Sequence, residues 1–330
     1  MLICCIAATG SLFSFAQKLK PPIKTIIIDP GHGGVDQGAT GDHSTEAHNA
    51  LAISFKVRDI LNKEFPEVKT LMTRQKDELP GGGTNVNAAL RYRADFANRN
   101  KGDLFLCIHL NSTSTKYLTR QEGTREQTYY TYSGKGKHKK KVAHTKEVPN
   151  YVRYKAPDQV HGTQTYIWAA GKSGPKEQAI EASGMMNEDA GMTDSSMDEE
   201  MNPNSVEFKL KAQQYLKYYF HNSLTLANNV EDEFKKAGRY SFGAMQRNEK
   251  GIWVLQATNM PSILVETGFI SDPKEEDYLS SEDGQQEVAQ CIVNAVKRYK
   301  EDLEMKQKKR QGGESTPEPA MVTQPGSGKH

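Results

Sequence analysis

Six short apolar runs constrain the fold of this 330-residue chain more than any other feature. Each run is nearly continuous in Ile, Val, Leu and other apolar residues instead of alternating with polar ones, which is typical of strands covered on both faces. The runs are candidate strands at residues 24–29, 68–73, 103–108, 163–169, 252–256 and 262–266.

Segments with helical periodicity separate these runs. Residues 45–64 place apolar side chains four positions apart, and residues 205–237 and 285–303 carry longer apolar stripes of the same kind. Strands that alternate with helices predict the α/β class. We therefore expect a twisted, mostly parallel mixed sheet of about six strands flanked by helices.

Two segments of opposite charge interrupt this alternation and are interpreted as insertions between sheet elements. Residues 116–160 contain 11 Lys/Arg and 4 Asp/Glu, a net charge of +7, whereas residues 172–207 contain 2 Lys and 9 Asp/Glu, a net charge of −7. The basic run KGKHKKK is interpreted as a solvated loop, with attraction of anionic envelope polymers as the functional hypothesis. No aromatic residues are interleaved in that run, which disfavours nucleic acid as a partner.

The two ends of the chain differ in composition from the rest. Residues 1–17 are apolar and end in small residues before KLK, which predicts a secretory signal peptide and an exported protein of the periplasm or cell envelope. A buried first element is the alternative. Residues 18–304 are then one domain with both insertions, and the polar, Pro- and Gly-rich tail 305–330 is predicted to be disordered. No segment of the mature chain is apolar enough to span a membrane.

A glycine-rich turn, GHGGVDQGATG, directly follows the first predicted strand. Known phosphate-binding loops need a Gly-Lys-Ser/Thr sequence, or a G-x-G-x-x-G sequence that opens a helix, and this turn offers neither. His32 instead lies where α/β sheets keep their binding sites, at the carboxyl end of a strand. This position favours a ligand role for His32.

Three further residues have positions that suit a metal site. His109 ends a second apolar strand, Glu46 lies at the start of the 45–64 helix, and Glu266 ends a third strand before a glycine turn. Two histidines and one glutamate leave a tetrahedral zinc ion one open position, which is typical of catalytic sites. With a second carboxylate to carry a proton, this chemistry predicts amide hydrolysis.

The whole pattern resembles a known family, the zinc-dependent N-acetylmuramoyl-L-alanine amidases of the amidase-3 type. The resemblance covers roughly residues 24–300 apart from the insertions, and its pieces follow the family's order. They are IIIDPGHGGVDQGATG, the TE at 45–46, TLMTRQKDE, RYRADFAN, DLFLCIHLNS and MPSILVETGFISDPKEEDYL.

This resemblance implies that His32, Glu46 and His109 hold one Zn²⁺ and that Glu266 is the catalytic carboxylate. The implied reaction is hydrolysis of the amide between the lactyl group of N-acetylmuramic acid and L-alanine in peptidoglycan, for wall remodelling or daughter-cell separation. Ala47 stands where the family usually has lysine. His43 and His48 therefore stay open as rivals of Glu46.

The acidic insertion has a counterpart in some relatives of this family, where an added helix covers the site until a partner protein moves it. Residues 172–207 occupy the corresponding interval, and Glu177, Glu181 or Glu188 could reach the metal. The resemblance thus implies an autoinhibitory lid and an activator protein that acts on this insertion. A disordered acidic loop is the alternative.

Two other classes of function stay open at this point: a catalytically silent peptidoglycan-binding protein, and a zinc hydrolase of another amide. Arg74 and Arg91 are interpreted as structural ion-pair residues. Asn111 is interpreted either as a substrate contact or as a turn cap. Cys107 and Cys291 lie in apolar runs, which predicts buried free thiols.

Overall fold

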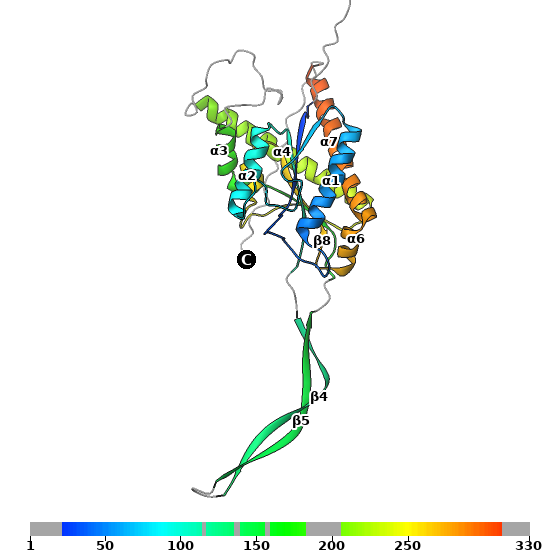
Figure 1. Ribbon diagram of the computed structural model, residues 1–330. Helices are drawn as coiled ribbons and strands as arrows, with labels where there is room; N and C mark the ends of the chain where they lie inside the picture. The colour runs from blue at the N-terminus through cyan, green and yellow to red at the C-terminus, as the bar shows by residue number, and fades with distance from the viewer. Residues whose placement is uncertain (1–21, 114–116, 135–138, 156–158, 183–205, 312–330) are drawn as a thin grey trace, which may run out of the picture.

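The computed structural model describes residues 22–113, 117–134, 139–155, 159–182 and 206–311 (Figure 1). The predicted signal peptide, residues 1–17, lies outside these residues. No helix in the described part of the chain is long and apolar enough to cross a bilayer.

The architecture is α/β, with a six-stranded sheet in the order β2-β1-β3-β8-β6-β7 and helices on both faces. β2, β1, β3 and β8 run parallel, β6 is antiparallel to β8, and β7 is parallel to β6. The fold class predicted from the sequence is confirmed. The sheet strands are β1 (Thr25–Pro30), β2 (Lys69–Met72), β3 (Leu104–Asn111), β6 (Thr163–Ile167), β7 (Ser241–Gln246) and β8 (Ser262–Phe269).

Two hydrophobic layers hold the helices to this sheet. Ile26, Ile28 and Val265 face a core formed with α1, α4 and α7, and Ile27 and Phe105 face a second core formed with α2 and α5. This alternation explains why the strand sequences are continuously apolar. The helices are α1 (Glu46–Glu64), α2 (Val86–Arg99), α3 (Gly174–Ala182), α4 (Val206–Lys236), α5 (Trp253–Ala257), α6 (Pro273–Ser280) and α7 (Glu282–Gln311), with a short 3-10 turn at Ala170–Lys172.

One of the six predicted strands is wrong. Residues 252–256 lie in the short helix α5, whose Val254 and Leu255 pack onto the sheet face. A short apolar run fits a buried helix as well as a buried strand, so its periodicity could not decide between the two. The sixth strand is β7, which the sequence analysis missed because SFGAMQ has an internal glycine and lies half-exposed at the sheet edge.

The basic insertion forms a long antiparallel hairpin of β4 (Tyr117–Ser133) and β5 (Lys140–Lys155), which extends away from the rest of the domain (Figure 1). The loop predicted for KGKHKKK, residues 135–141, is wrong at Lys140 and Lys141, which begin β5, whereas Lys139 precedes the strand and 135–138 lie outside the described residues. At the other end of the chain, α7 continues to Gln311, beyond the point where a disordered tail was predicted to begin. Residues 312–330 lie outside the described part.

Lys176 fixes α3, the described part of the acidic insertion, to the protein. Its side chain is fully buried, and its Nζ donates to the carbonyl oxygens of Leu255 (2.9 Å), Thr258 (2.9 Å) and Met260 (3.0 Å). Burial lowers the pKa of Lys176 well below its ordinary value. The segment 255–260 immediately precedes β8, so α3 is attached near the amino end of that strand.

Replacing Lys176 by alanine should lower the free energy of unfolding by about 2–4 kcal/mol, because three buried carbonyls lose their donor and a cavity replaces the side chain. Chemical denaturation would measure this loss. The control is Lys209→Ala on exposed α4 sequence, which should change stability by less than about 0.5 kcal/mol. Equal effects of the two substitutions would contradict an anchoring role for Lys176.

Candidate metal centre

The pairing of β1 with β3 brings the two strand-end histidines to one edge of the sheet. The strands are parallel and in register, with Asp29 opposite Cys107 and Pro30 opposite Ile108. The chain leaves β1 through Gly31, whose N–H donates to the carbonyl of Ile108 at 2.9 Å. His32 and His109 therefore lie beside each other, with ring centroids 4.9 Å apart.

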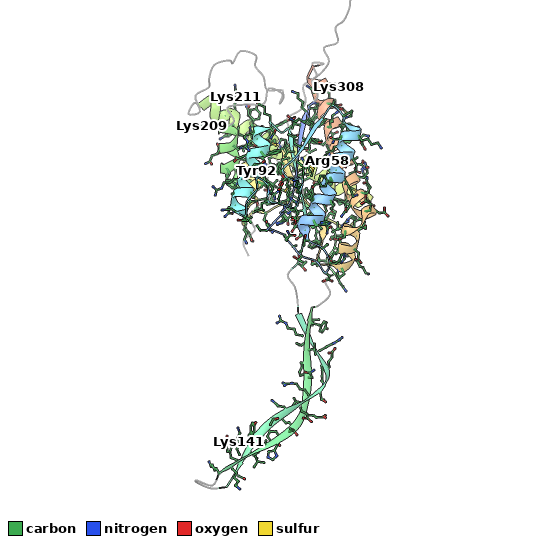
Figure 2. All side chains as sticks on the ribbon, viewed as in Figure 1. Arg58, Tyr92, Lys141, Lys209, Lys211 and Lys308 are labelled. Atoms are coloured by element: carbon green, nitrogen blue, oxygen red, sulfur yellow. The ribbon has the colours of Figure 1, made fainter. Side chains whose placement is uncertain are left out.

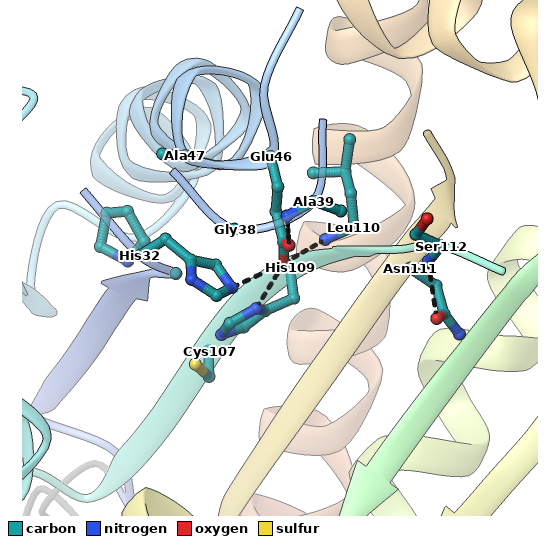
Figure 3. A network of polar contacts seen from close by, with 12 residues as sticks. His32, Gly38, Ala39, Glu46, Ala47, Cys107, His109, Leu110, Asn111 and Ser112 are labelled. Carbon is teal, nitrogen blue, oxygen red and sulfur yellow. Dashed lines mark hydrogen bonds and ion pairs between the residues drawn. The ribbon is translucent and has the colours of Figure 1, made fainter. Parts of the chain in front are cut away.

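Glu46 joins the two histidines from the first turn of α1. Its Oε1 is 3.1 Å from Nε2 of His32 and 2.7 Å from Nδ1 of His109 (Figure 3). Thr45 caps this helix by accepting from the N–H of His48, which fixes where the helix begins. The structure thus brings together all three residues that the sequence analysis selected as metal ligands.

Backbone donors hold the Glu46 carboxylate in place. The N–H of Ala39 donates to Oε2 at 2.8 Å, and the N–H of Leu110 donates to Oε1 at 3.2 Å. Burial disfavours the charged form of Glu46, but hydrogen bonds and charge from His109 and His32 outweigh it and lower its pKa well below the usual range. Glu46 is therefore an ionised, preoriented oxygen donor.

A second carboxylate orients the His32 ring. The Asp36 carboxylate is 2.9 Å from Nδ1 of His32 and is placed there by a tight turn in which Gly33 and Asp36 exchange backbone hydrogen bonds. Nδ1 of His32 faces this carboxylate without forming a hydrogen bond among the described residues, and Nε2 faces Glu46, so Nε2 is the nitrogen available to a metal that Glu46 also binds. Burial lowers the pKa of His32, but Glu46 and then Asp36 more than compensate, so that its pKa is raised.

The donor set fits a divalent transition metal. One ligand atom from each of His32, Glu46 and His109 lies within 4.8 Å of the others, and all three side chains are mostly buried. Two imidazole nitrogens and one carboxylate oxygen are the ligands of mononuclear catalytic zinc sites, and they leave a position open for a reactant.

Glycine is required at two positions near His32, because the backbone there lies close to the ligand side chains. A Cβ at Gly31 would lie 2.5 Å from the His109 ring, and a Cβ at Gly38 would lie 2.5 Å from Glu46 Oε2 and 2.7 Å from the His32 ring. Gly38 also has a φ of +66°, which favours glycine. The glycine-rich turn therefore lets the backbone pass between the three ligand side chains.

Two buried arginines hold the turn that carries His32, which itself has a φ of +55°. Arg93 forms an ion pair with buried Asp29 and donates to the carbonyls of Pro30 and His32, both at 2.7 Å. Arg74 donates to the carbonyls of Pro30, Gly31 and Ala47 at 3.1, 2.6 and 2.7 Å. The loop thus keeps a strained conformation because Arg74 and Arg93 donate hydrogen bonds to its carbonyl oxygens.

This finding corrects one part of the sequence analysis. Arg91, which was selected as structural, is exposed on α2, whereas Arg93 two positions later is buried and paired. The sequence does place Arg93 on the apolar face of α2, four residues after Ala89 and four before Ala97, but it does not show the acceptors that Arg93 reaches. Arg74 is structural as expected, although its partners are carbonyls instead of a carboxylate.

Glu276 of α6 holds the segment before α1 from the other side. Its carboxylate accepts from the backbone N–H groups of Asp42 (2.6 Å), His43 (2.9 Å) and Ser44 (2.7 Å), and from the Ser44 hydroxyl (2.8 Å). Burial opposes its ionisation, but these bonds outweigh burial and lower the pKa of Glu276. This contact fixes the loop that ends at Glu46, and the sequence analysis did not find it.

Glu266 lies next to the three ligands on β8. It is opposite His109 in the β3–β8 register, so both side chains project from the same face of the sheet. Its Oε2 is buried and has no hydrogen-bond partner among the described residues. Burial raises the pKa of Glu266 to about 7, and the nearby charge of His109 only partly opposes this. It is thus a carboxyl group poised to exchange a proton near neutral pH.

Other residues selected from the sequence lie around this centre without joining it. His43 is half-exposed and lies near Glu276 (3.5 Å) and Asp277 (3.7 Å), and His48 is exposed on α1. Neither belongs to the group of His32, Glu46 and His109. Asn111 donates to Gln164 at 3.2 Å and accepts from the N–H of Ser112 at 2.8 Å, beyond the end of the site.

Cys107 and Cys291 are free, buried thiols, as the sequence predicts. Cys107 lies two residues before His109 on the same face, and its Sγ is 3.1 Å from Asp29 Oδ2. The thiol therefore packs below the three ligands instead of joining them.

The described part of the acidic insertion lies far from this centre. Lys176 of α3 also approaches Ser262, at 3.2 Å, and Ser262 is opposite Phe105 in the sheet register. Phe105 is four residues before His109, a distance of roughly 13 Å along a strand. Glu177 on α3 is therefore not placed at the metal centre. The side chain of Glu181, and all of Glu188, lie outside the described residues.

Comparison with known proteins identifies the family of this chain. The family profile described as N-acetylmuramoyl-L-alanine amidase matches residues 26–298. Among curated proteins, N-acetylmuramoyl-L-alanine amidase AmiC of Escherichia coli O6:H1 is 28% identical over 83% of this chain and 52% of its own length. AmiA of Escherichia coli K12 is 25% identical over 84% of this chain and 76% of its own length. The chain thus spans about half of the first of these relatives.

A solved structure shows the same fold. The CwlD amidase of Clostridioides difficile, determined in complex with the GerS lipoprotein, superposes with a TM-score of 0.51 over 84% of this chain and 98% of its own, at 20% identity.

Replacing Asp36 by asparagine should weaken metal binding by roughly 10–100-fold, because the His32 ring loses the carboxylate that fixes its orientation. Competition of the protein with a chromophoric chelator for Zn²⁺ would measure this. Asp95→Asn, on the exposed face of α2, is the control with the same change of side chain. An unaltered affinity in Asp36→Asn would show that Asp36 does not support a metal ligand.

Proposed function

We propose that this chain, which belongs to the N-acetylmuramoyl-L-alanine amidase family, is a zinc-dependent hydrolase of peptidoglycan. The bond cleaved is the amide between the lactyl group of N-acetylmuramic acid and L-alanine of the stem peptide. The observation that carries this proposal is the meeting of His32, Glu46 and His109 at one sheet edge, with Glu266 beside them.

The geometry supports the following roles for these residues. His32, Glu46 and His109 would hold one zinc ion, with Asp36 and the N–H groups of Ala39 and Leu110 keeping two of these ligands in orientation. Bound zinc supplies Lewis-acid chemistry, which polarises a carbonyl oxygen and activates water. Arg74 and Arg93 hold the loop that carries His32, so this loop needs little rearrangement when zinc binds.

Glu266 would carry the proton. Its carboxylate takes a proton from the attacking water and delivers it to the amide nitrogen of L-alanine as the C–N bond breaks. The unpartnered, buried Oε2 supports this role, because such an atom costs free energy that a purely structural glutamate would avoid. The same observation disfavours a catalytically silent peptidoglycan-binding protein.

Location and partners follow from the substrate. A peptidoglycan hydrolase acts outside the cytoplasmic membrane, so we propose an exported protein of the cell envelope, with the periplasm as its compartment in a two-membrane cell. Wall remodelling or daughter-cell separation is the proposed process. An activator protein that acts on residues 172–207 is part of the proposal, with α3 and its Lys176 anchor as the fixed end of that segment.

Replacing Glu266 by alanine should leave zinc content unchanged and reduce turnover by roughly 10²–10⁴-fold, because a proton carrier is lost and no ligand is removed. His109→Ala should lose both metal and activity. Metal content would be measured by mass spectrometry, and activity by dye release from labelled sacculi, with products identified as intact stem peptides beginning with L-alanine. A Glu266→Ala enzyme with full activity would exclude the proposed role, and a different cleaved bond would favour a hydrolase of another amide.

The pH dependence gives an independent check on Glu266. A general base works only when ionised, so kcat/KM should rise with pH through an acid limb. Burial raises the pKa of Glu266 to about 7 in the metal-free protein, and the charge of a bound zinc ion acts in the opposite direction. The positive charge of Arg247 lowers this pKa. Arg247→Gln should therefore move the acid limb to higher pH, whereas Arg99→Gln on α2 should not. A limb that stays fixed in Arg247→Gln would assign it to another group.

A further inference from the structure

The β4–β5 hairpin is a surface that the proposed catalytic site does not use. β4 and β5 form a two-stranded sheet of their own, with neither strand paired to the six-stranded sheet. An isolated two-stranded hairpin is marginally stable in water, and it lacks a hydrophobic face of its own. Such a hairpin is therefore expected to act by contacting something outside the domain.

Both faces of the hairpin display aromatic rings. Directly opposite residues in the register share a face, which places Tyr129 with His144 on one face and Tyr130 and Tyr132 on the other. Tyr129, Tyr130 and Tyr132 are 43%, 52% and 66% exposed. Tyrosine combines an apolar ring with a polar hydroxyl, and exposed groups of tyrosines are typical of binding surfaces.

Lysine ammonium groups lie over two of these rings. Nζ of Lys141 is 3.6 Å from the Tyr130 ring centroid, and Nζ of Lys146 is 5.6 Å from that of Tyr129. The described residues of the hairpin contain eight Lys/Arg and three Glu. Lys139, Lys140, Lys141 and Lys146 form no ion pair with a carboxylate among the described residues, so their charge is available to an anionic ligand.

The hairpin is continuous with the strands that build the metal centre. β4 begins at Tyr117, six residues after Asn111 at the end of β3, the strand that carries His109. β5 ends at Lys155, and the chain then enters β6 at Thr163, whose Gln164 is opposite Glu266 in the register. Figure 1 shows the hairpin leaving the domain at this end of the sheet, and Figure 2 shows Lys141 near its tip and Lys209 at the opposite end of the molecule.

We infer that this hairpin is a second binding site for peptidoglycan. It binds the same polymer whose amide bonds are cleaved at the metal centre. The inference rests on the proposed function. Peptidoglycan presents both chemistries that the hairpin matches: sugar rings whose C–H faces pack on tyrosine, and stem peptides that carry free carboxylates for the lysines. Binding through two distant sites on one polymer raises the effective concentration of substrate at the catalytic site.

Two features favour a polymer over a folded protein partner. The tyrosines and lysines lie on both faces of the hairpin, which suits a ligand that surrounds a thin arm better than a ligand with one flat interface. They are also spread along the strands in cation–ring pairs, at Arg120 with Tyr154, Lys146 with Tyr129 and Lys141 with Tyr130. A repeated pairing of this kind matches a repeating ligand.

The test separates binding from catalysis. All proteins in this test are full chains that carry Glu266→Ala, which prevents turnover. The charge variant K139Q/K140Q/K141Q/K146Q should bind purified sacculi about tenfold more weakly than its parent in a sedimentation assay. Binding of the parent to sacculi should fall steeply as the salt concentration rises. K209Q/K217Q, on exposed positions of α4, is the control and should bind like the parent. Y130S/Y132S should weaken binding without changing the salt dependence.

A deletion of the hairpin tests its link to activity in the otherwise native enzyme. Tyr117 and Lys155 are opposite each other in the register, so residues 118–154 can be replaced by an Asn-Gly turn without moving the ends. The shortened enzyme should cleave a soluble muropeptide at the parent rate and sacculi at a rate at least fivefold lower. Equal loss on both substrates would overturn the inference, because the hairpin would then serve the catalytic site itself.

Other outcomes are equally decisive. The inference would be overturned if the charge variant bound sacculi as tightly as its parent. It would also be overturned if the parent protein bound phosphatidylglycerol vesicles more tightly than sacculi, because the ligand would then be a membrane. If the native enzyme cleaves neither muropeptide nor sacculi while the charge variant still loses binding, the proposed reaction fails and the binding site stands.

Discussion

The parallel, in-register pairing of β1, β3 and β8 is the constraint on which the rest of the structure depends. It places Asp29 opposite Cys107, and His109 opposite Glu266, so that groups from distant parts of the sequence share one face at one sheet edge. A shift of one residue in either pair would turn His109 or Glu266 to the other face, into the core formed with α1, α4 and α7. The buried, continuously apolar strands make such a shift costly, because each strand is specified on both faces.

A layer of buried charge then converts this rigid sheet edge into a shaped loop. Arg93 and Asp29 form an ion pair below the His32 turn, and the remaining guanidinium donors of Arg93 and Arg74 satisfy main-chain carbonyls at residues 30–32. A buried pair of this kind contributes little net stability, but removal of one partner leaves an uncompensated charge. Its value here lies in geometry, because it holds His32 at a positive φ with the ring toward Glu46. Glu276 supplies the equivalent support on the other side of α1.

The sequence predicts those elements and residues whose positions follow from local patterns of apolar and polar residues. Five of the six sheet strands, the three long helices and the approach of His32, Glu46 and His109 followed from apolar runs, periodicity and the strand-end positions of the histidines, with the family resemblance supplying the roles. The α5 segment could not be assigned, because a five-residue apolar run carries no period. Arg93 and Glu276 were missed because their importance lies in carbonyls and N–H groups that only the folded backbone brings to them. The β4–β5 hairpin was missed because its lysines suggested a solvated loop, although its Thr and Tyr residues favour strand.

The basic hairpin and α3, the described part of the acidic insertion, are attached at opposite ends of the sheet. The basic hairpin connects the carboxyl end of β3 to the amino end of β6, at the sheet edge where the metal centre lies, whereas Lys176 holds α3 at the amino end of β8. The inferred binding of an anionic polymer gives the unpaired lysines of the hairpin a physical reason.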